Sequence, residues 1–529
     1  MSNEDWLLEA DERGNRSTHI DEGKGSAAWS TGNRIEALIH GSEYFDRLVG
    51  CVADLRAGDE LFVTDWRGDD DELLSPDGPR VGELLTAAAR RGVHVRGLLW
   101  RSHPQVFGFN QAEQGELARI VNEAGGEMLL DQRVRRAGSH HQKLVLLRSH
   151  GDEVAFVGGI DLCHGRRDTA AHFGDPQAER LDPAFGPNPP WHDIQAEVRG
   201  PAIADLAESF RERWNDRTPL ERRGFRRPRI LARRTEEPPL PPPIPPFGTP
   251  PAPAGSHTVQ VLRTYPAKRP PYPFAREGER SIARLYTKVF RRARALIYVE
   301  DQYFWSEDIA RLYCDALTSS PDLRLIAVVP RYPDRNGVLS GPTTRLGQLA
   351  MMDRLREAGG DRVAVFDLEN ERGDAIYLHA KTVIIDDVIA LIGSDNMNRR
   401  SWTHDSELSI AILDEEHDAR PPQDPGGLGD GSRRFARDLR LRLWREHLGV
   451  ASDEGLLDPV EGFDRWREAA AALDRWHHDG CKGPRPLGRV RFHRPDPIHP
   501  WQRVWARPLY RMVVDPDGRP WGLRRRHRF

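Results

Sequence analysis

Two copies of one short motif, set far apart in the chain, constrain the fold more than any other feature. Each copy is a His-x-Lys triplet that leads into an apolar run: His141-Gln142-Lys143 precedes Leu144–Leu147, and His379-Ala380-Lys381 precedes Thr382–Ile385. The two histidines are 238 residues apart. Strands, a Gly-containing turn, a His-Asp segment and a closing amphipathic helix recur around both triplets in the same order. Such an ordered set of matches predicts a duplicated structural unit.

The repeated order of elements also predicts the fold class. In each half a helical stretch precedes a strand that ends at an aspartate, Asp65 or Asp301, and a further helix and strand follow. Strands that alternate with helices of about a dozen residues are typical of sheets covered by helices on both faces. We therefore expect an α/β fold of two tandem α/β/α sandwich domains with mixed central sheets, related by a pseudo-twofold axis.

A proline-rich segment divides the chain. Ten of the 16 residues from Pro238 to Pro253 are proline, which excludes a helix or a central strand and predicts an extended linker. A ligand for an SH3-type domain is the alternative interpretation. The predicted organisation has five parts: a flexible acidic N-terminus (1–30), an N-terminal half (31–235), the linker (236–257), a C-terminal half (258–450) and a helical, basic extension (451–529).

Composition predicts a soluble globular protein. The net charge of −4 over 529 residues favours no nucleic-acid binding by the surface as a whole. No apolar stretch is long enough to span a bilayer, and the acidic first 25 residues lack the apolar core of a signal peptide. The four cysteines show no metal-binding spacing, so we expect a cytoplasmic location and no zinc site.

The C-terminal extension is strongly basic. Residues 481–529 carry 13 Arg and Lys against 3 Asp. Such a tail can contact anionic lipid headgroups, and a solubilising or salt-bridged extension is the alternative. If the substrate is a lipid, a chain without a membrane span must meet the bilayer from outside, as a peripheral protein.

The two triplets suit phosphoryl transfer from a diester. Residues i and i+2 of a strand face the same side, so each triplet places a histidine beside a lysine. One imidazole can attack phosphorus while the other protonates the leaving alcohol, and two ammonium groups can hold the charge of the non-bridging oxygens. The predicted catalytic residues are therefore His141, Lys143, His379 and Lys381.

Further residues complete the predicted site. Catalytic histidines need orienting carboxylates, and the candidates are Asp193 and Glu407, each in the segment that follows its triplet, with Asp405 as the alternative in the second half. Asn396 can donate to a phosphate oxygen. The candidate substrate-binding residues are Asp161, Ser394, Trp66 and Tyr303, although core packing suits the two aromatic rings at least as well.

At these residues the chain resembles the phospholipase D superfamily, whose signature is HxKxxxxD followed by a GG or GS turn. The second copy matches in full, from His379 through Asp386 to Gly393-Ser394 and Asn396. Residues 297–304, Val328-Val329-Pro330 and Trp191-His192-Asp193 are similar to the phospholipase D branch in particular, and we take the bacterial members as the model. The similarity runs over roughly residues 35–450.

The first copy departs from the signature, because Arg148 stands where the motif has aspartate. In the family this aspartate, here Asp386 and carried over with the catalytic residues, is thought mainly to brace its strand. The departure therefore affects local structure more than catalysis. Asp152 or Glu153 can substitute by pairing with Arg148.

The resemblance implies a ping-pong reaction through a phosphohistidine, with no metal or other cofactor. By analogy with bacterial members, His141 is the nucleophile and His379 the acid and base, although the sequence does not settle this order. The first hypothesis is a monomeric phospholipase D-type phosphodiesterase that cleaves glycerophospholipid headgroups at a membrane surface and transfers the phosphatidyl group to water or an alcohol. The alternatives are cardiolipin synthase-like transfer, a nuclease, and a lipid- or phosphate-binding pseudoenzyme.

Overall fold

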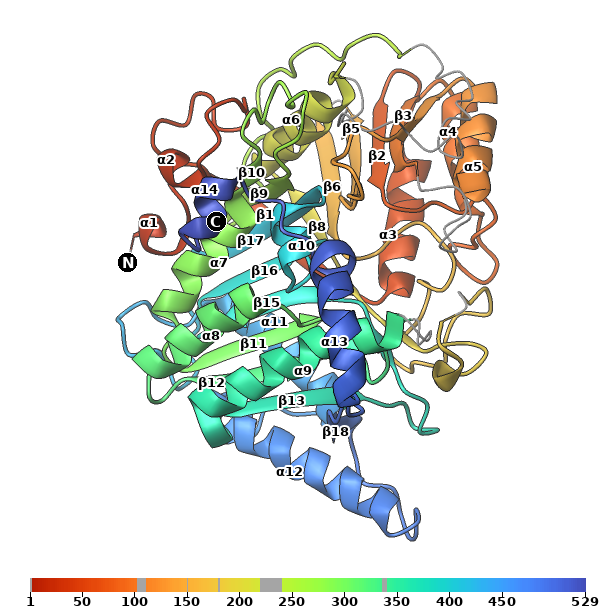
Figure 1. Cartoon of the computed structure of the whole chain (residues 1–529). Coiled ribbons are helices and arrows are strands. Elements are labelled where there is room, and N and C mark those ends of the chain that lie inside the picture. Colours follow the sequence, from red (N-terminus) through yellow and green to blue (C-terminus); the bar gives the residue numbers. More distant parts are fainter. Residues whose placement is uncertain (1, 102–110, 150, 179–180, 219–239, 335–339) are drawn as a thin grey trace.

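Strands from both halves of the chain form one continuous sheet (Figure 1). The computed structural model describes residues 2–101, 111–149, 151–178, 181–218, 240–334 and 340–529. Outward from the centre of the sheet, the strand order is the same in both halves, which confirms the predicted duplication within an α/β fold.

The seven repeated strands of each half are as follows. The N-terminal half contributes β1 (Ser30–Ile39), β8 (Ile194–Arg199), β6 (Asp152–Gly158), β5 (Leu144–Ser149), β2 (Glu60–Asp65), β3 (His94–Trp100) and β4 (Glu127–Asp131). The C-terminal half contributes β9 (His257–Tyr265), β17 (Glu407–Asp414), β16 (Ile389–Gly393), β15 (Lys381–Ile385), β11 (Leu296–Asp301), β12 (Arg324–Val328) and β13 (Val363–Leu368). At the ends, β18 (Val490–Phe492) pairs with β13, and β10 (Glu279–Arg280) pairs with β9.

Each half mixes parallel and antiparallel pairing. The outer strands β2, β3 and β4 are parallel, as are β11, β12 and β13, whereas the inner pairs are antiparallel. The two halves meet where β1 runs antiparallel to β9, through a short seam with an irregular register between Ser30 and Asn33. The two expected sheets are therefore joined edge to edge, with the pseudo-twofold axis between β1 and β9.

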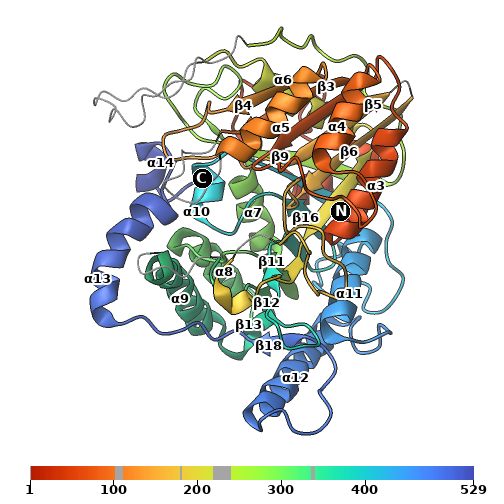
Figure 2. The same ribbon diagram turned by 90° about the vertical axis from the view of Figure 1, so that its right-hand side faces the viewer.

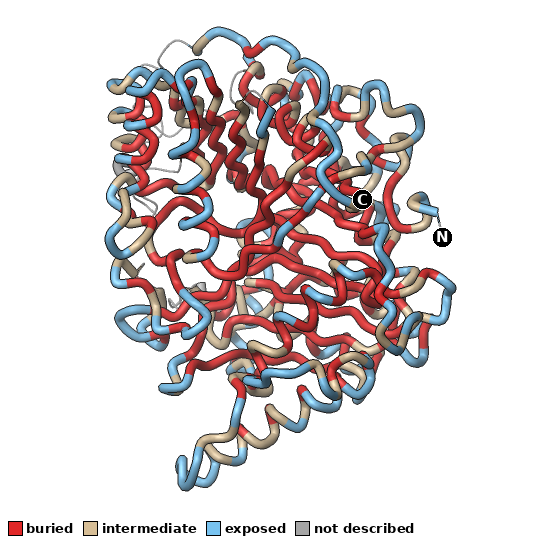
Figure 3. The backbone as a smooth tube through the Cα atoms, turned by 180° about the vertical axis from the view of Figure 1, so that it is seen from behind, coloured by how far each residue is buried: buried red, intermediate tan, exposed pale blue. Residues whose placement is uncertain are grey.

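Helices cover the sheet because their apolar stripes pack against the alternating apolar residues of the strands. One buried cluster lies under α3 (Gly41–Ala53), α4 (Val81–Arg90) and α5 (Gln111–Glu123). A second lies under α7 (Ser281–Arg292), α8 (Glu307–Ser319) and α9 (Ser340–Gly359). A third contains residues of α6 (Ala202–Trp214), α11 (Arg434–Leu448) and α12 (Pro459–His478). Figure 3 shows the buried sheet and its exposed periphery.

The N-terminal segment differs from the flexible terminus that we expected from its acidic composition. Short helices α1 (Asn3–Trp6) and α2 (Ala10–Arg13) pack close to α7. Trp6 is fully buried, and the Arg13 guanidinium forms ion pairs with Asp21 and the buried Glu279. The apolar run at residues 6–8 and this buried arginine hold the segment against the C-terminal half.

The described part of the proline-rich linker, residues 240–256, contains neither helix nor strand. It packs against the end of α6, where the Trp214 indole donates to the Pro242 carbonyl and Asn215 exchanges hydrogen bonds with Ile244. Among the described residues, we find no helix that combines the length and apolar character needed to cross a membrane.

Candidate active site

Each His-x-Lys triplet lies beside a segment of the other half. β14 (Tyr377–Leu378), just before His379, pairs in parallel with β7 (Trp191–His192) of the N-terminal half. The His379 N–H donates to the His192 carbonyl at 2.8 Å. In the matching place the His141 N–H donates to the Ser406 carbonyl at 2.9 Å. These two backbone contacts are equivalent under the pseudo-twofold axis, so each half completes the site of the other.

The orienting carboxylates are consequently exchanged between the halves. His141 Nδ1 lies 2.8 Å from Glu407 Oε2, and His379 Nδ1 lies 2.6 Å from Asp193 Oδ2. Chain order alone does not reveal this, because each carboxylate follows the triplet of its own half. The structure brings together both predicted histidines and both predicted carboxylates, in crossed pairs.

His379, Asp193 and Glu407 are buried, whereas the His141 side chain is 15% exposed. Burial is the largest influence on the pKa of each of the four groups. It lowers the pKa of His141 and of His379 well below the usual histidine value, with the nearby lysines adding to the effect. It raises the pKa of Glu407 and of Asp193. Burial therefore disfavours the charged form of every group in the two pairs, imidazolium and carboxylate alike. A proton on Nδ1 leaves the Nε2 lone pair available for attack on phosphorus.

The two lysines lie against the histidines. Lys143 Nζ is 3.2 Å from the His141 carbonyl, and Lys381 Nζ donates to the His379 carbonyl. Both ammonium groups lower the pKa of both histidines, which places all four predicted catalytic residues in one electrostatic environment. Burial lowers the pKa of Lys381 to about 8. Two cations held in a buried site suit the charge of a phosphodiester.

Three residues that the sequence did not single out as site residues, Asp65, Arg166 and Gln302, surround Lys143 and Lys381. In the N-terminal half, Asp161 lies 3.1 Å from Lys143 Nζ and 3.5 Å from the Arg166 guanidinium. Burial and the neighbouring Asp161 raise the pKa of Asp65 well above the usual range. In the C-terminal half, the Gln302 amide oxygen lies 3.4 Å from Lys381 Nζ. Asp65 carried a signal, as a strand-ending aspartate, whereas nothing in the sequence marked Arg166.

The residues of the second Gly-containing turn have separate roles. The Ser394 hydroxyl donates to Glu407 Oε2 at 2.6 Å, so Ser394 holds a carboxylate where we predicted a substrate contact. Asn396 is buried, and its Oδ1 has no hydrogen-bond partner in the described ranges. Asp405, the alternative carboxylate, accepts from the Ser139 N–H and the Arg400 guanidinium, away from His379.

Aromatic rings line the surroundings of both histidines. The predicted Trp66 lies edge-on to His141 at 6.0 Å between centroids, and Tyr303 stacks on Trp305 at 4.3 Å. Next to His379, Trp191 begins a row of rings, each within 5.4 Å of the next: Trp191, Tyr377, Phe185 and Tyr332. Trp66 and Trp191 therefore pack beside His141 and His379, respectively.

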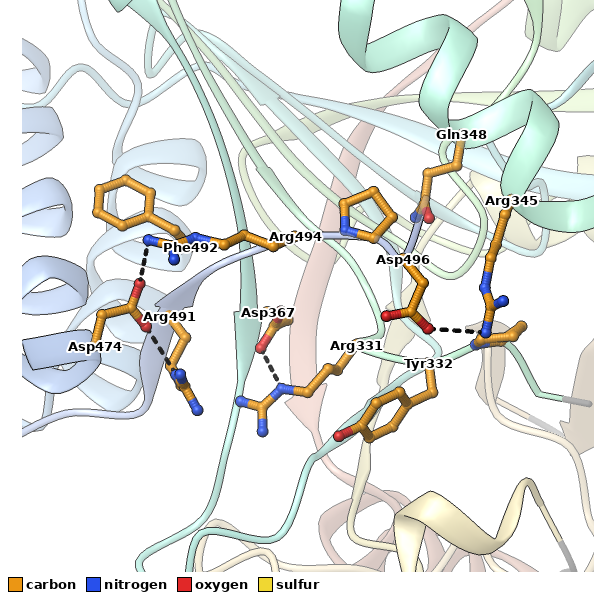
Figure 4. A pocket seen from close by; sticks show the side chains of 12 residues that line it. Arg331, Tyr332, Arg345, Gln348, Asp367, Asp474, Arg491, Phe492, Arg494 and Asp496 are labelled. Atoms are coloured by element: carbon orange, nitrogen blue, oxygen red, sulfur yellow. Dashed lines mark hydrogen bonds and ion pairs between the residues drawn. The ribbon is translucent and has the colours of Figure 1, made fainter. Parts of the chain in front are cut away.

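The row ends at a cavity of about 280 Å³ (Figure 4). Its four arginines pair with three aspartates: Arg331 with Asp367, Arg345 with Asp496, and both Arg491 and Arg494 with Asp474. None of the catalytic triplet residues lines this cavity. The cavity is therefore separate from the cluster of the two triplets.

Asp386, which we carried over with the catalytic residues, lies elsewhere. It follows β15 at the end opposite Lys381, about 16 Å away at the rise of a strand. Its carboxylate accepts from the N–H groups of Arg294, Ala295 and Leu296 at 2.7–2.8 Å. It therefore braces the start of β11 and takes no part in the catalytic cluster.

The first half replaces this brace with side-chain ion pairs. Arg148 lies 3.0 Å from Glu60 at the start of β2 and 3.1 Å from Glu153 on β6. Asp152, the other candidate partner, pairs with Arg199. In the C-terminal half, the Asp386 carboxylate joins the end of β15 to backbone N–H groups at the start of β11. In the N-terminal half, the Arg148 guanidinium joins the end of β5 to the start of β2.

We expect Asp386→Ala to lower the free energy of unfolding by about 3 kcal/mol, because it leaves three backbone donors without their acceptor. Denaturant unfolding measures this loss. The matched control is Glu153→Ala, which removes a partly exposed ion pair and should cost less than ~1 kcal/mol. A variant of Asp386 with full stability and no turnover would place this residue in the chemistry after all.

Comparison with known proteins gives the family. The phospholipase D family model matches residues 71–232 and 353–477, which together make up more than half of the chain. The chain belongs to the phospholipase D family. The two matched ranges contain both triplets and the two carboxylates, Asp193 and Glu407, that contact the histidines. These residues of the candidate site therefore all lie within the part of the chain that matches the family.

Curated relatives of this phospholipase D family chain come from plants and a slime mould. Phospholipase D alpha 2 of Oryza sativa subsp. japonica is 26% identical over 75% of this chain and 62% of its own length. Phospholipase D A of Dictyostelium discoideum is 28% identical over 74% of this chain and 34% of its own length. The chain thus spans less than two thirds of the length of these relatives.

Among solved structures, phosphatidylserine synthase of Haemophilus influenzae Rd KW20 is similar to this chain in part. It is 15% identical, covers 72% of this chain and 82% of its own, and has a TM-score of 0.49.

Proposed function

We propose that this chain is a phospholipase D-type phosphodiesterase that cleaves glycerophospholipid headgroups and transfers the phosphatidyl group to water or an alcohol, as the bacterial members of the phospholipase D branch do. The observation that carries the proposal is the pair of crossed histidine–carboxylate contacts with two buried lysines. One imidazole with a lone pair on Nε2, a second that carries a proton on Nε2, and two ammonium groups would provide the nucleophile, the acid and the anion-stabilising charges that diester cleavage needs.

The proposed reaction has two steps. His379 enters the reaction protonated on Nε2. His141 Nε2 attacks phosphorus, the bond from phosphorus to the headgroup oxygen breaks, and the departing alkoxide takes the Nε2 proton of His379. Water or an alcohol then gives its proton to His379 and attacks phosphorus, which breaks the bond to His141 and releases phosphatidic acid or a phosphatidyl alcohol. Asp193 and Glu407 orient the rings, while Lys143 and Lys381 hold the non-bridging oxygens.

The test is incubation with mixed glycerophospholipids and a primary alcohol, with the products identified by mass. Phosphatidyl alcohol and phosphatidic acid support the proposal. Diphosphatidylglycerol formed from phosphatidylglycerol would select cardiolipin synthase-like transfer, and cleavage of DNA without a lipid product would select a nuclease. Binding of lipid without any product would select the pseudoenzyme.

The C-terminal arm, residues 499–529, supports action at a membrane surface. It contains α13 (Pro500–Leu509), a following π-helical turn to Val514, and α14 (Trp521–Arg525), and α13 packs along α9 (Figures 1 and 2). Its large exposed apolar side chains are Trp501, Val504, Met512, Val513 and Trp521. Exposed arginines are interleaved with them, among them Arg503, Arg507, Arg511, Arg525 and Arg526. Exposed tryptophan with arginine is typical of contact with anionic lipid.

The arm is also fastened to the active site. The Gly518 N–H donates to the Thr403 hydroxyl, and the Arg135 guanidinium donates to the Gly518 carbonyl. Thr403 and Arg135 lie just before Glu407 and His141 in the chain. Contact of the arm with a bilayer would therefore bring the segments that lead into Glu407 and His141 near the lipid.

We expect Trp501→Ser together with Trp521→Ser to weaken binding to vesicles that contain anionic phospholipid by ~10-fold or more, because two indoles that would be buried in the bilayer are lost from the interface. Vesicle co-sedimentation measures the change. The control is Leu487→Ser, which removes a side chain that is 75% exposed outside the arm. Equal binding of all three proteins would assign lipid contact to another surface.

A further inference from the structure

A second cluster of ionisable side chains lies behind the active site and has no part in the proposed reaction. It consists of His40, His172, His192 and Glu446, whose candidate ligand atoms all lie within 4.8 Å of one another. The three histidines are buried. They come from the end of β1, the loop before β7, and β7 itself, whereas Glu446 comes from α11 of the C-terminal half. The cluster therefore spans the boundary between the halves.

Hydrogen bonds decide where two of these rings carry their protons. His172 Nδ1 lies 2.9 Å from the Trp191 carbonyl, which can only accept, so this nitrogen carries the proton. His192 Nε2 lies 2.8 Å from the carboxylate of Glu300. In their neutral forms, both rings therefore have a lone pair on the other nitrogen, His172 Nε2 and His192 Nδ1.

Both lone pairs face the same carboxylate. His172 Nε2 is 3.0 Å and His192 Nδ1 is 3.7 Å from Glu446 Oε1, and His192 Nδ1 has no hydrogen-bond partner in the described residues. His40 Nε2 lies 3.0 Å from Glu446 Oε2. Two nitrogen lone pairs opposite an anion repel it, so a positive charge must lie between them. The Arg489 guanidinium, 3.6 Å from Glu446, reaches one side of this carboxylate.

We propose that His40, His172, His192 and Glu446 bind one zinc ion that fastens the two halves together behind the active site. Three imidazoles and a carboxylate are a ligand set that zinc takes in tetrahedral geometry, where bonds of about 2.1 Å put neighbouring ligand atoms about 3.4 Å apart. The separations of 3.0 and 3.7 Å from Glu446 lie on either side of that value. Four protein ligands leave no open position, so the ion is structural.

The surrounding residues suit such an ion. Glu300 accepts from His192 Nε2, from His447 Nε2 at 2.7 Å and from the Tyr298 hydroxyl at 2.6 Å. A carboxylate behind a histidine ligand fixes its ring and strengthens it as a donor. His192 stands between Trp191 and Asp193, and its carbonyl receives the His379 N–H. The proposed ion thus positions Asp193 and His379 through the backbone.

A proton is the competing source of positive charge. The carboxylates of Glu300 and Glu446 oppose the effect of burial and raise the pKa of His192 to about 10, which favours an imidazolium in that place. An imidazolium at His172 would also be able to donate to Glu446 and to Trp191 at once. The experiment must therefore distinguish zinc from protons by a direct measurement of metal.

The test uses the full chain. After dialysis against a chelator and then against zinc, elemental mass spectrometry should find about one zinc ion per chain, with a Tm several degrees above that of the chelated protein. His40→Gln with His172→Gln should lose the zinc and this difference in Tm. His477→Gln removes a partly exposed histidine that pairs with Glu369, and it should retain both.

Two results would overturn the proposal: a wild-type chain that takes up no zinc and has the same Tm with and without chelator, or variants that keep a full equivalent of zinc. The first result would mean that a proton on a histidine supplies the positive charge beside Glu446. The second would mean that zinc binds at another place in the protein. The measurement on the wild-type chain shows whether the protein binds zinc even if the double variant does not fold. Since metal content and Tm are measured without substrate, the outcome is independent of the proposed lipid chemistry.

Discussion

His141→Ala and His379→Ala should each reduce turnover of a phospholipid by ~10³-fold or more, the scale seen when a member of a covalent catalytic unit is removed. Loss of His141 removes the proposed nucleophile, and loss of His379 removes the proton donor for the leaving alcohol. Initial rates of headgroup release measure both effects. Because both rings are bonded to buried carboxylates, circular dichroism and Tm must show that each variant is folded.

The two variants should differ in what accumulates on the protein. With His379→Gln, slow turnover of the covalent intermediate should leave a phosphatidyl adduct that peptide mass analysis places on His141. With His141→Gln, no adduct should form. An adduct on His379 in the latter variant would reverse the assigned roles, and near-normal turnover in either alanine variant would remove the phosphohistidine mechanism altogether.

Asp193→Asn and Glu407→Gln should each lower turnover by ~10²-fold or more with little change in KM, because a neutral amide no longer favours the ring proton on Nδ1. The crossed contacts add a specific expectation. Asp193→Asn should disturb the ring of His379, at 2.6 Å, and Glu407→Gln that of His141, at 2.8 Å. Nitrogen NMR of the histidine rings reports which one changes tautomer.

The matched control is Asp405→Asn, close to Glu407 in the chain but bonded to Ser139 and Arg400. It should leave both ring tautomers as they are, whatever it does to stability. If Asp193→Asn instead altered the ring of His141, each half would hold its own carboxylate, and the exchange between the halves would be wrong.

Much of this architecture is predictable because repeated local patterns carry it. An apolar run after each triplet predicts a strand, and a strand places residues i and i+2 on one face. The apolar runs form β5 and β15 as expected, but His141, Lys143 and His379 lie just before these strands, so the strand rule alone does not fix where their side chains lie. The ordered recurrence of the other elements then predicts two equivalent halves.

Other features depend on contacts between distant residues. The acidic N-terminus reads as flexible until the burial of Trp6 and Arg13 is seen. Ser394 looks like a substrate contact until its hydroxyl is found on Glu407. The cluster around Glu446 has no spacing that a motif search would detect, because its histidines and its carboxylate lie up to 406 residues apart.

By itself, the sequence determined the α/β elements, their duplication, the two His-x-Lys triplets and the phospholipase D signature, since each is contained in short stretches of chain. Only the tertiary structure decided that β1 and β9 join the halves into one sheet and that Asp193 and Glu407 serve the opposite histidines. The physical reason is that the pseudo-twofold packing sets each triplet beside the other half. Pairing across that axis is a property of three-dimensional packing, which chain order does not record.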